Sequence, residues 1–374
     1  MRHLLHVYAT FAVGGPQMRL AAILNRHPRR WRHSIIAMDG NTACRERLPG
    51  DIAIDFPDPG LIKGDTAGNL WRIWGLLRRM RPDLLVTSNW GSIEWALANR
   101  ATGVAHLHVE DGFGPEERDR QLPRRVWTRR LALWGRPVVV PSRTLERIAT
   151  GVWRLDPARV RYLPNGIDLA RFAAGPVEHG GPVQVGPMRI GPMRIGTVAA
   201  LRPEKNLGRL LRAFAAMGDQ EARLTIVGDG PARAELEVLA RALGVAERVC
   251  FAGHQADPSR FYAGFDVFAL SSDTEQMPLS VLEAMAAGLP VAATDVGDVK
   301  AMLSVENADH VTARDDAALA GALDRLAGDP GRRAIGAANR RKAETDYADE
   351  TMFAAYATLF DGATLHDSAP PVVK

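Results

Sequence analysis

Cysteine, lysine and long apolar runs are scarce in this sequence. Cys44 and Cys250 are the only two cysteines among 374 residues, too few for a disulfide framework or a thiolate metal site. A reducing cytoplasm is therefore the expected compartment. No run of ~18 uninterrupted apolar residues occurs, which argues against a membrane-spanning helix. The first residues, MRHLLHVYATFAVGG, contain two histidines and no clear small-residue cleavage site, so they predict a buried strand rather than a signal peptide.

Lysine is the rarest charged residue, with five among 47 basic side chains, so arginine carries most of the positive charge. The net charge of +4 is unevenly distributed: residues 1–172 hold 27 basic and 16 acidic side chains, and residues 173–374 hold 20 and 27. A GC-rich genome would explain the preference for arginine but not this distribution. Hydrophobic and charged fractions of 46% and 24% are those of an ordinary globular protein. We expect a basic and an acidic domain with different partners.

Strand and helix patterns alternate along both halves of the chain. Short apolar runs in the first half alternate with helical periodicity, at 3–13, 34–38, 83–88, 104–109 and 137–141. The second half predicts further strands at 194–200, 222–227, 248–252, 266–270 and 290–293, again with helices between them. Such alternation predicts an α/β fold with two doubly wound, parallel-sheet domains.

The domain boundaries follow from composition and periodicity. We expect a first domain over 1–172, a Gly/Pro-rich linker over 173–192 and a second domain over 193–345. Within the linker region GPMRI occurs twice in tandem, at 186–190 and 191–195, and only the second copy is expected to enter a strand. Residues 346–360 predict a C-terminal helix, and 361–374 a flexible tail.

In doubly wound domains ligands bind at the carboxyl ends of the strands. The first such loop contains Gly14 and Gly15, which would let the backbone approach a phosphate or sugar, although a plain turn fits equally well. In the second half, Arg202 and Lys205 flank a turn that opens a helix and would suit a pyrophosphate; solvated charges explain them equally well. Gly228 lies in a Gly-Asp-Gly-Pro turn that suits either a bound nucleotide or a tight turn.

The segment from Ser271 to Pro290 carries the most specific pattern. Glu275 falls in a loop after a strand, and Glu283 lies about one turn into the next helix. Free amides in the stretch from Met277 through Pro278 and Leu279 to Ser280 could donate hydrogen bonds to phosphate oxygens, while Glu283 could bind a diol such as a ribose. Two carboxylates and a helix start at one strand end suit a sugar nucleotide better than a bare phosphate.

Glu-x7-Glu followed by Ala-Met-Ala-Ala-Gly-Leu-Pro-Val, and preceded by Arg-Pro-Glu-Lys-Asn and Gly-Asp-Gly-Pro, resembles the donor-binding domain of retaining glycosyltransferases of family 4. The resemblance extends in order through Gly14-Gly15, Val140-Pro141-Ser142 and Pro164-Asn165-Gly166-Ile167-Asp168. It implies the GT-B architecture, in which two Rossmann-like domains face a central cleft. It also implies that the final helix crosses back onto the first domain.

The same resemblance implies residue roles. Glu283 would hold the ribose of a nucleotide-sugar. Glu275 would bind the hydroxyls of the donor sugar, close to the reacting centre. Arg202 and Lys205, with the amides of 277–279, would neutralise the diphosphate, so no metal and no cofactor are implied. Gly14 and Gly15 would let the first-domain loop reach the donor phosphate and the acceptor, and Gly228 would approach the nucleotide.

The sequence departs from the family pattern after the strand at 104–109. Family members often place a histidine where this chain has Asp111, which could take the acceptor proton with His108 as its neighbour. A structural turn residue is the other interpretation of Asp111. On an alternating strand His106, His108 and Glu110 share one face and Asp111 takes the other, so not all of them can reach one site.

An arginine-rich stretch follows this loop. Its arginines alternate with apolar residues and suit an anionic membrane surface or a phosphorylated lipid acceptor: Arg118, Arg120, Arg124, Arg125, Arg129 and Arg130. A solvated helix with Trp127 in the core explains the pattern equally well. No nucleic-acid motif accompanies the charge, so nucleic acid is not an expected partner.

The predicted function is a metal-independent glycosyltransferase that acts in the cytoplasm, with a possible peripheral place on the inner face of the cytoplasmic membrane. Its partners would be a nucleoside-diphosphate sugar and a glycan or lipid-linked acceptor of envelope or exopolysaccharide assembly. Two alternatives stay open: a catalytically silent sugar-nucleotide-binding protein, for which the Asp111 departure is the reason, and a GT-B-like sugar-nucleotide isomerase. A phosphorylase would need a cofactor lysine site, which the sequence does not reveal.

Overall fold

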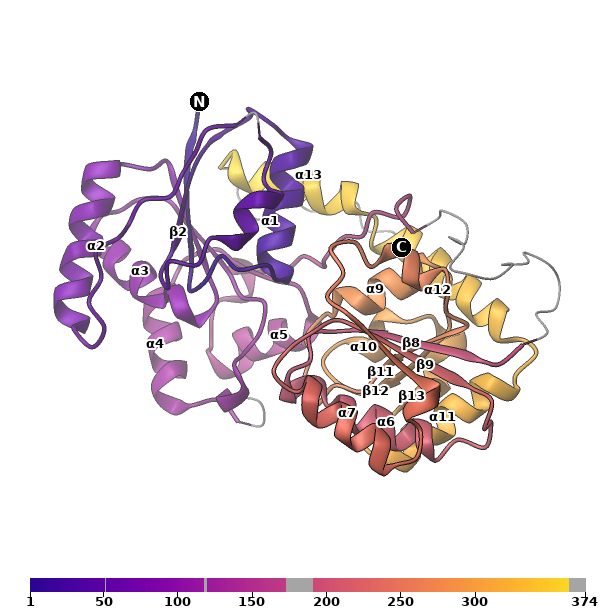
Figure 1. The fold of residues 1–374 in the computed structure, drawn as a ribbon. Coiled ribbons are helices and arrows are strands. Elements are labelled where there is room, and N and C mark those ends of the chain that lie inside the picture. Colours follow the sequence, from indigo (N-terminus) through magenta and orange to yellow (C-terminus); the bar gives the residue numbers. More distant parts are fainter. Residues whose placement is uncertain (51, 118–119, 173–190, 363–374) are drawn as a thin grey trace. The chain divides into compact units, whose positions relative to one another are not determined.

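The computed structural model describes residues 1–50, 52–117, 120–172 and 191–362. The chain divides into two compact units (Figure 1), one formed by Met1–Asn165 with Glu350–Lys374 and the other by Gly166–Asp349. Each unit contains one parallel β-sheet. Residues 173–190, which hold most of the expected linker and the first GPMRI copy, lie outside the described residues, as does the expected tail beyond residue 362.

The first unit is built on a seven-stranded sheet in the order β3-β2-β1-β4-β5-β6-β7. All its strand pairs are parallel. The strands are β1 (His3–Tyr8), β2 (Arg32–Ala37), β3 (Ile54–Asp55), β4 (Leu84–Ser88), β5 (His106–Val109), β6 (Val138–Val140) and β7 (Val160–Tyr162). The short strands β3 and β7 were not expected from the sequence, because runs this short carry little periodicity.

Helices cover both faces of this sheet. Leu4 of β1 packs with α1 (Gly15–Arg26) and α13 (Asp349–Phe360), whereas Leu5 and Val7 pack with α2 (Thr66–Met80) and α3 (Ile93–Ala98). The second face also carries α4 (Pro123–Leu133) and α5 (Arg143–Arg147). Alternate strand residues therefore face the two helix layers, as the period of two in a strand requires.

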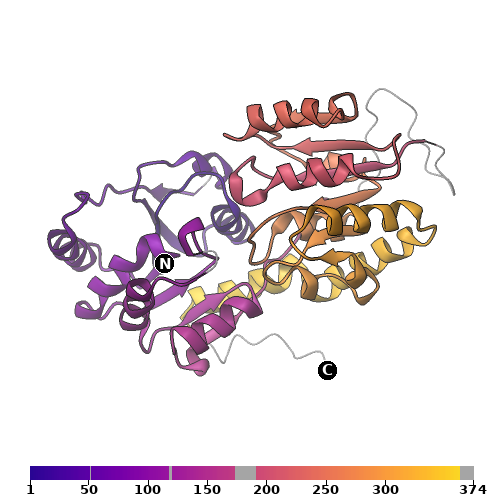
Figure 2. The same ribbon diagram turned by 90° about the horizontal axis from the view of Figure 1, so that it is seen from below.

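The second unit has six parallel strands in the order β10-β9-β8-β11-β12-β13. These are β8 (Arg194–Val198), β9 (Arg223–Val227), β10 (Val249–Gly253), β11 (Val267–Leu270), β12 (Val291–Thr294) and β13 (Val311–Thr312). One face packs against α6 (Leu207–Ala215), α7 (Arg233–Ala242) and α11 (Asp316–Gly328). The other face packs against α8 (Ser259–Tyr262), α9 (Leu279–Ala286) and α10 (Val299–Met302), and α12 (Arg332–Asp346) lies beside α9. Figure 2 shows this layering from below.

The chain crosses from the first unit to the second earlier than the sequence indicated. Residues 166–172 belong to the second unit, not to the first domain, because Ile167 bridges to Ala348 and both Ile167 and Phe172 lie in that unit's core. The last helical pattern also breaks into α12 and α13 at Tyr347 and Ala348. Strand β8 starts at Arg194, within the second GPMRI copy.

Helix α13 is the last helix of the described chain, yet it belongs to the first unit (Figure 1). Its buried side chains join the core that contains Leu4 of β1 and Trp31: Met352, Phe353, Tyr356, Leu359 and Phe360. The Phe360 ring lies edge-on to the rings of His6 and Trp31, with centroids 5.6 and 5.4 Å away. The C-terminal segment therefore completes the core begun by the first strand.

Candidate functional site

The second unit brings two of the predicted loops together. Strands β8 and β11 are neighbours in the sheet, and in an open parallel sheet the loops that follow such a pair border a crevice. The loop after β8 carries Lys205, and the loop after β11 carries Glu275. Lys205 Nζ donates to Glu275 Oε1 at 2.6 Å, and the Asp273 amide donates to the Glu204 carbonyl at 2.9 Å.

Glu275 is held from two sides. Ser272 Oγ donates to the same carboxylate oxygen at 2.8 Å, and the side chain of Glu275 is 11% exposed. The cation predicted to bind phosphate and the carboxylate predicted to bind the sugar therefore form one ion pair. This pairing leaves no buried charge unbalanced at the strand ends.

Arg202 precedes the short 3₁₀ turn Pro203–Lys205, and its side chain is exposed. Within the described part of the chain it forms no ion pair or side-chain hydrogen bond, so its guanidinium is available to an anion. Arg202 and Lys205 thus differ: one cation is exposed, and the other is already paired.

Gly228 serves the fold of this region directly. Its φ of +136° is one that side-chain-bearing residues rarely adopt, and an added Cβ would lie 1.9 Å from the Ala199 carbonyl oxygen. The loops after β8 and β9 therefore touch through backbone atoms at this glycine. Gly297 has a similar role, because a Cβ there would lie 2.2 Å from the Glu275 carbonyl oxygen. Both glycines let neighbouring loops pack closely.

Helix α9 starts at the predicted phosphate-binding segment. Met277 and Pro278 are buried, Pro278 is the N-cap residue, and Leu279 is the first residue of the helix. No side chain caps this helix. The amides of a first helical turn have no intrahelical acceptor, so their partial positive charge is available to an anion.

Glu283 lies on α9 and has a partner different from those of Glu275. Tyr262 is fully buried, and its hydroxyl group donates a hydrogen bond to Glu283 Oε2 at 2.5 Å. Burial raises the pKa of Glu283 to about 7, and the hydrogen bond from Tyr262 and the charge of Arg171 offset this only in part. A buried carboxyl group with such a raised pKa is typical of a functional site.

The predicted glycines of the first unit lie where β1 leads into α1. Gly14 is the N-cap residue of α1 with extended φ and ψ of −164° and 168°, and Gly15 begins the helix. Neither has the positive φ that requires glycine. At Gly14 an added Cβ would lie 2.8 Å from Gln17 Oε1, the end of a flexible side chain.

Asp111 follows β5 and faces α1. Arg19 of α1 binds both of its oxygens, with Nη1 to Oδ1 at 2.5 Å and Nη2 to Oδ2 at 2.8 Å, and it also donates to Asn165 Oδ1 at 2.9 Å. The Asn89 side chain accepts the Asp111 amide at 2.6 Å. Arg19 further lies 5.5 Å from the ring centroid of Tyr356 in α13. Asp111 is therefore a fixed, paired carboxylate.

His108 points to the opposite face and is fully buried. Its Nδ1 shares a 2.8 Å hydrogen bond with Thr87 Oγ1, and its Nε2 lies 3.5 Å from Glu110 Oε2. His106 contacts the same threonine hydroxyl at 2.8 Å. The alternation inferred from the sequence is confirmed: these side chains share a face, and Asp111 lies on the other.

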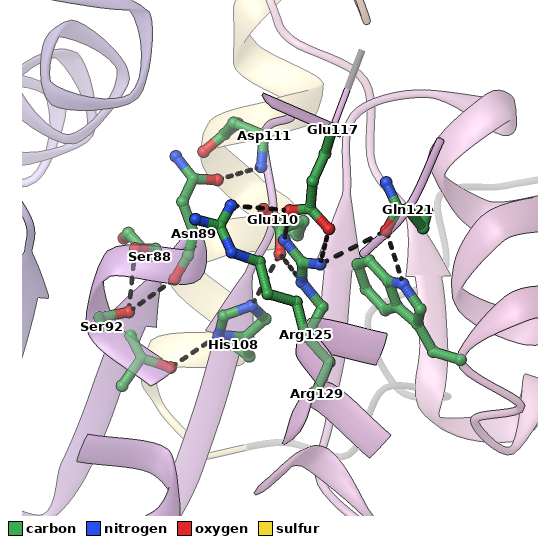
Figure 3. Close-up of polar contacts among 12 residues, drawn as sticks. Ser88, Asn89, Ser92, His108, Glu110, Asp111, Glu117, Gln121, Arg125 and Arg129 are labelled. Atoms are coloured by element: carbon green, nitrogen blue, oxygen red, sulfur yellow. Dashed lines mark hydrogen bonds and ion pairs between the residues drawn. The ribbon is translucent and has the colours of Figure 1, made fainter. Parts of the chain in front are cut away.

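Glu110 leads from β5 into a buried charged cluster (Figure 3). Arg129 of α4 lies with Nε 3.4 Å from Glu110 Oε2 and binds Glu117 through Nη1 at 3.0 Å and Nη2 at 2.9 Å. Arg129, Glu110 and Glu117 are almost fully buried, and Arg125 adds a 3.1 Å ion pair to Glu117. Two arginines face two glutamates, so the four charges of this cluster balance.

Metal-binding clusters and membrane-spanning helices are both absent from the described part of the chain. Across the described ranges no group of three or more histidine, cysteine or acidic side chains is arranged to hold a metal ion. Among the described helices none combines the length and the apolarity needed to cross a bilayer.

Comparison with known proteins identifies the family. Residues 13–171 match the family model described as Glycosyltransferase Family 4, and residues 192–329 the one described as Glycosyl transferases group 1. D-inositol 3-phosphate glycosyltransferase of Actinosynnema mirum is 30% identical over 299 residues, which cover 74% of this chain and 69% of that protein. The chain belongs to glycosyltransferase family 4. The family expected from the motifs is thus confirmed.

One further relative of this family 4 glycosyltransferase and two solved structures of similar fold extend the likeness. Lipopolysaccharide core biosynthesis glycosyltransferase LpsD of Rhizobium meliloti is 33% identical over 159 residues, 42% of this chain and 46% of LpsD. HepE from Anabaena, crystallised with UDP, has a TM-score of 0.77 at 18% identity, covering 96% of this chain and 100% of HepE. Sucrose-phosphate synthase from Thermosynechococcus elongatus has a TM-score of 0.76 at 19% identity, covering 99% and 100%. The predicted fold of two Rossmann-like, parallel-sheet domains is confirmed.

The contacts or burial of some residues in this family 4 glycosyltransferase were not predicted from the sequence. Arg19, which binds Asp111, stands within an ordinary helical pattern, and nothing in its spacing reveals its partner. Tyr262, the partner of Glu283, likewise gave no signal. Asn165 lies within the Pro-Asn-Gly-Ile-Asp motif, and this motif could have directed attention to it. Arg129, expected on a solvated or membrane-facing surface, is buried instead, and Trp127, which one alternative placed in the core, is 67% exposed.

Proposed function

We propose that this glycosyltransferase moves a sugar from a nucleoside-diphosphate sugar to a glycan or lipid-linked acceptor of the bacterial envelope, with retention at the anomeric carbon. The observation that carries this proposal is the meeting of Lys205, Glu275 and the start of α9 at the ends of β8 and β11. Relatives named for lipopolysaccharide core biosynthesis, and a fold neighbour crystallised with UDP and glucose, support the same donor and acceptor classes.

The proposed chemistry follows from the leaving group. Cleavage of a sugar–diphosphate bond builds negative charge on the departing phosphate, and fixed cations beside that charge lower the barrier. Arg202 is exposed and available, and Lys205 is close to it in the chain. The amides of Leu279 and Ser280, the first two residues of α9, would add hydrogen bonds to the same phosphates.

The carboxylates have separate proposed roles. Glu275, fixed by Lys205 and Ser272, would accept hydrogen bonds from the donor-sugar hydroxyls. Glu283 would accept those of the ribose, for which it must lose its proton. Gly228 would act indirectly, by letting the loops after β8 and β9 pack together beside the nucleotide.

In the first unit we assign acceptor contact to Asp111 and positioning to His108. Asp111 is partly accessible, whereas His108 is fully buried and contacts Glu110 and Thr87. Arg19 occupies both oxygens of Asp111, so Asp111 would orient the acceptor or take its proton only after this pairing loosens. The loop of Gly14 and Gly15 would contact the donor phosphate and the acceptor.

We also propose a location in the cytoplasm and on the inner face of the cytoplasmic membrane, where a lipid-linked envelope acceptor would be met. The positive charge of residues 1–172 supports this location, because anionic lipids of that leaflet attract basic surfaces.

The proposal is tested by nucleoside-diphosphate release from a panel of nucleotide-sugars, with lipid-linked and soluble glycan acceptors. We expect turnover with at least one pair, and a raised unfolding temperature with the matching nucleotide diphosphate, because a ligand of the native state stabilises it. Binding without turnover in every combination would instead favour a silent sugar-nucleotide-binding protein, for which the occupied Asp111 gives a structural reason.

The ribose assignment has its own test. Glu283→Ala should abolish the shift in unfolding temperature that the nucleotide diphosphate produces, because the ribose loses its hydrogen-bond acceptor. Glu237→Ala on α7 is the matched control, since Glu237 is a surface carboxylate paired with Arg233. An undiminished shift in Glu283→Ala would refute the assignment.

A further inference from the structure

Helix α4 buries a charged residue and exposes large apolar residues, the reverse of an ordinary amphipathic helix. Arg129 is fully buried, together with Ala132 and Leu133, on the side that faces the sheet. Trp127 and Leu131 are 67% and 63% exposed, and Trp134, just after the helix, is 60% exposed. At 100° per residue these three apolar side chains lie within one third of the helix circumference, opposite Arg129.

The contacts of Arg129 fix this orientation. Besides the ion pairs with Glu117 and Glu110 (Figure 3), its guanidinium carbon lies 4.9–5.2 Å from the ring centroids of Trp90, Phe113 and Trp153. Turning α4 so that Trp127 became buried would pull this arginine out of its carboxylate and aromatic surroundings. The exposure of Trp127, Leu131 and Trp134 is therefore imposed by the fold.

Cations border the exposed apolar residues. The guanidinium carbon of Arg130 lies 5.3 Å from the ring centroid of Trp127. Arg124, about one helical turn before Trp127, is exposed. In the described part of the chain neither of these two arginines forms an ion pair, whereas Arg125, on the inner side, is bound to Glu117. We name Arg124, Trp127, Arg130, Leu131 and Trp134 the α4 surface.

We propose that the α4 surface docks the protein on an anionic lipid bilayer. Tryptophan side chains are enriched at the level of the lipid headgroups, and arginines beside them can bind lipid phosphates. The border of unpaired cations favours an anionic bilayer over a protein partner, because an apolar protein contact would not need them. The inference deepens the proposed function by assigning the membrane contact to one helix of the first unit.

The test measures sedimentation of the full chain with large vesicles of phosphatidylcholine, alone or mixed with phosphatidylglycerol. We expect binding to the mixed vesicles only, and a loss of binding at high salt, because salt screens surface charge. The variant Trp127→Ser/Leu131→Ser/Trp134→Ser should lose at least about ten-fold in partitioning. Arg124→Gln and Arg130→Gln should each weaken it about five-fold at low salt.

Trp71→Ser is the matched control, because Trp71 is 73% exposed but lies on α2. It should bind vesicles as the unchanged protein does. An equal loss in Trp71→Ser, normal sedimentation of the triple variant, or no binding of the unchanged protein to mixed vesicles would each overturn the proposal. Concentration-dependent self-association that the triple variant abolishes, without vesicle binding, would overturn it in favour of a protein contact.

Failure of this inference and failure of the proposed function give different results. Each variant is also assayed without vesicles, by the thermal shift with uridine diphosphate and by nucleoside-diphosphate release with a soluble acceptor. The α4 surface holds no residue of the proposed donor or acceptor machinery, so both readouts should remain unchanged. If the unchanged protein shows no turnover, the proposed transferase activity is contradicted, but the vesicle-binding result still holds.

Discussion

At the scale of single residues, the carboxyl groups of Asp111 and Glu283 differ in their partners and surroundings. Arg19 binds both oxygens of Asp111, whereas Glu283 is largely buried, accepts a hydrogen bond from Tyr262 and interacts electrostatically with Arg171 and Asp257. Burial favours the protonated form of Glu283 and raises its pKa to about 7, so this carboxyl group is sensitive to pH near neutrality.

The raised pKa of Glu283 predicts how stability depends on pH. Its pKa is about 7 in the folded chain against 4.5 for the unperturbed group, so the folded state holds this proton more tightly. Stability therefore falls as the pH rises from about 4.5 to about 7. Glu283→Gln keeps the hydrogen bond from Tyr262 and removes this loss, and at pH 8 it should raise the free energy of unfolding by up to about 3 kcal/mol.

Urea denaturation at pH 5 and pH 8 measures this effect. The gain should shrink strongly at pH 5, and nucleotide binding should weaken at both pH values. A gain that is the same at pH 5 and pH 8 would show that ionisation of Glu283 does not cause it.

Arg129 predicts a large structural effect. Arg129→Met would leave Glu110 and Glu117 buried without their common cation and should cost about 3–5 kcal/mol in the free energy of unfolding. Arg124→Met, an exposed arginine of the same helix, should change it by less than about 0.5 kcal/mol. Chemical denaturation of the two variants compares them directly, and equal stabilities would contradict the buried ion pairs.

At the scale of elements, the structure explains why certain loops carry glycine. The loops after β8 and β9 contact one another at Gly228, where a Cβ has no room. The loops after β11 and β12 do the same at Gly297. These contacts hold the strand ends of the candidate donor site together before any ligand binds.

Gly228→Ala should therefore lower the free energy of unfolding by about 2 kcal/mol or more, through backbone strain and the contact with the Ala199 carbonyl. Gly75→Ala on α2 is the control: nothing lies within 4 Å of the added Cβ, so it should stabilise the helix by about 0.5–1 kcal/mol. Thermal unfolding distinguishes the two. Similar melting temperatures would mean that the loops can move apart freely.

At the scale of the whole molecule, the two units are built from a chain that leaves the first unit at Asn165 and returns to it at Glu350. Helix α13 thus contributes core side chains to a sheet whose first strand lies at the other end of the sequence. All eight tryptophans precede residue 154, so tryptophan fluorescence reports on the first unit alone.

Phe360→Ala should shift the fluorescence-detected unfolding transition to lower denaturant concentration, because it removes a ring that packs on Trp31 and His6. A cost of about 3–5 kcal/mol is expected for a buried phenylalanine. Leu323→Ala, in the core of the second unit, should change the circular-dichroism transition more than the fluorescence transition. A fluorescence transition that responds to Leu323→Ala and not to Phe360→Ala would refute this division.

The sequence by itself determined the family, the two parallel-sheet domains and most strand positions, because these depend on local periodicity and on motifs that are contiguous in the chain. The positions of Lys205 and Glu275 at one edge of the sheet could be predicted for the same reason: each follows a strand, and parallel strands end at one edge. Only the tertiary structure decided their pairing, the clamp of Arg19 on Asp111 and the burial of Arg129. Those depend on contacts between distant segments, where the neutralisation of buried charge outweighs the local preference of arginine for solvent.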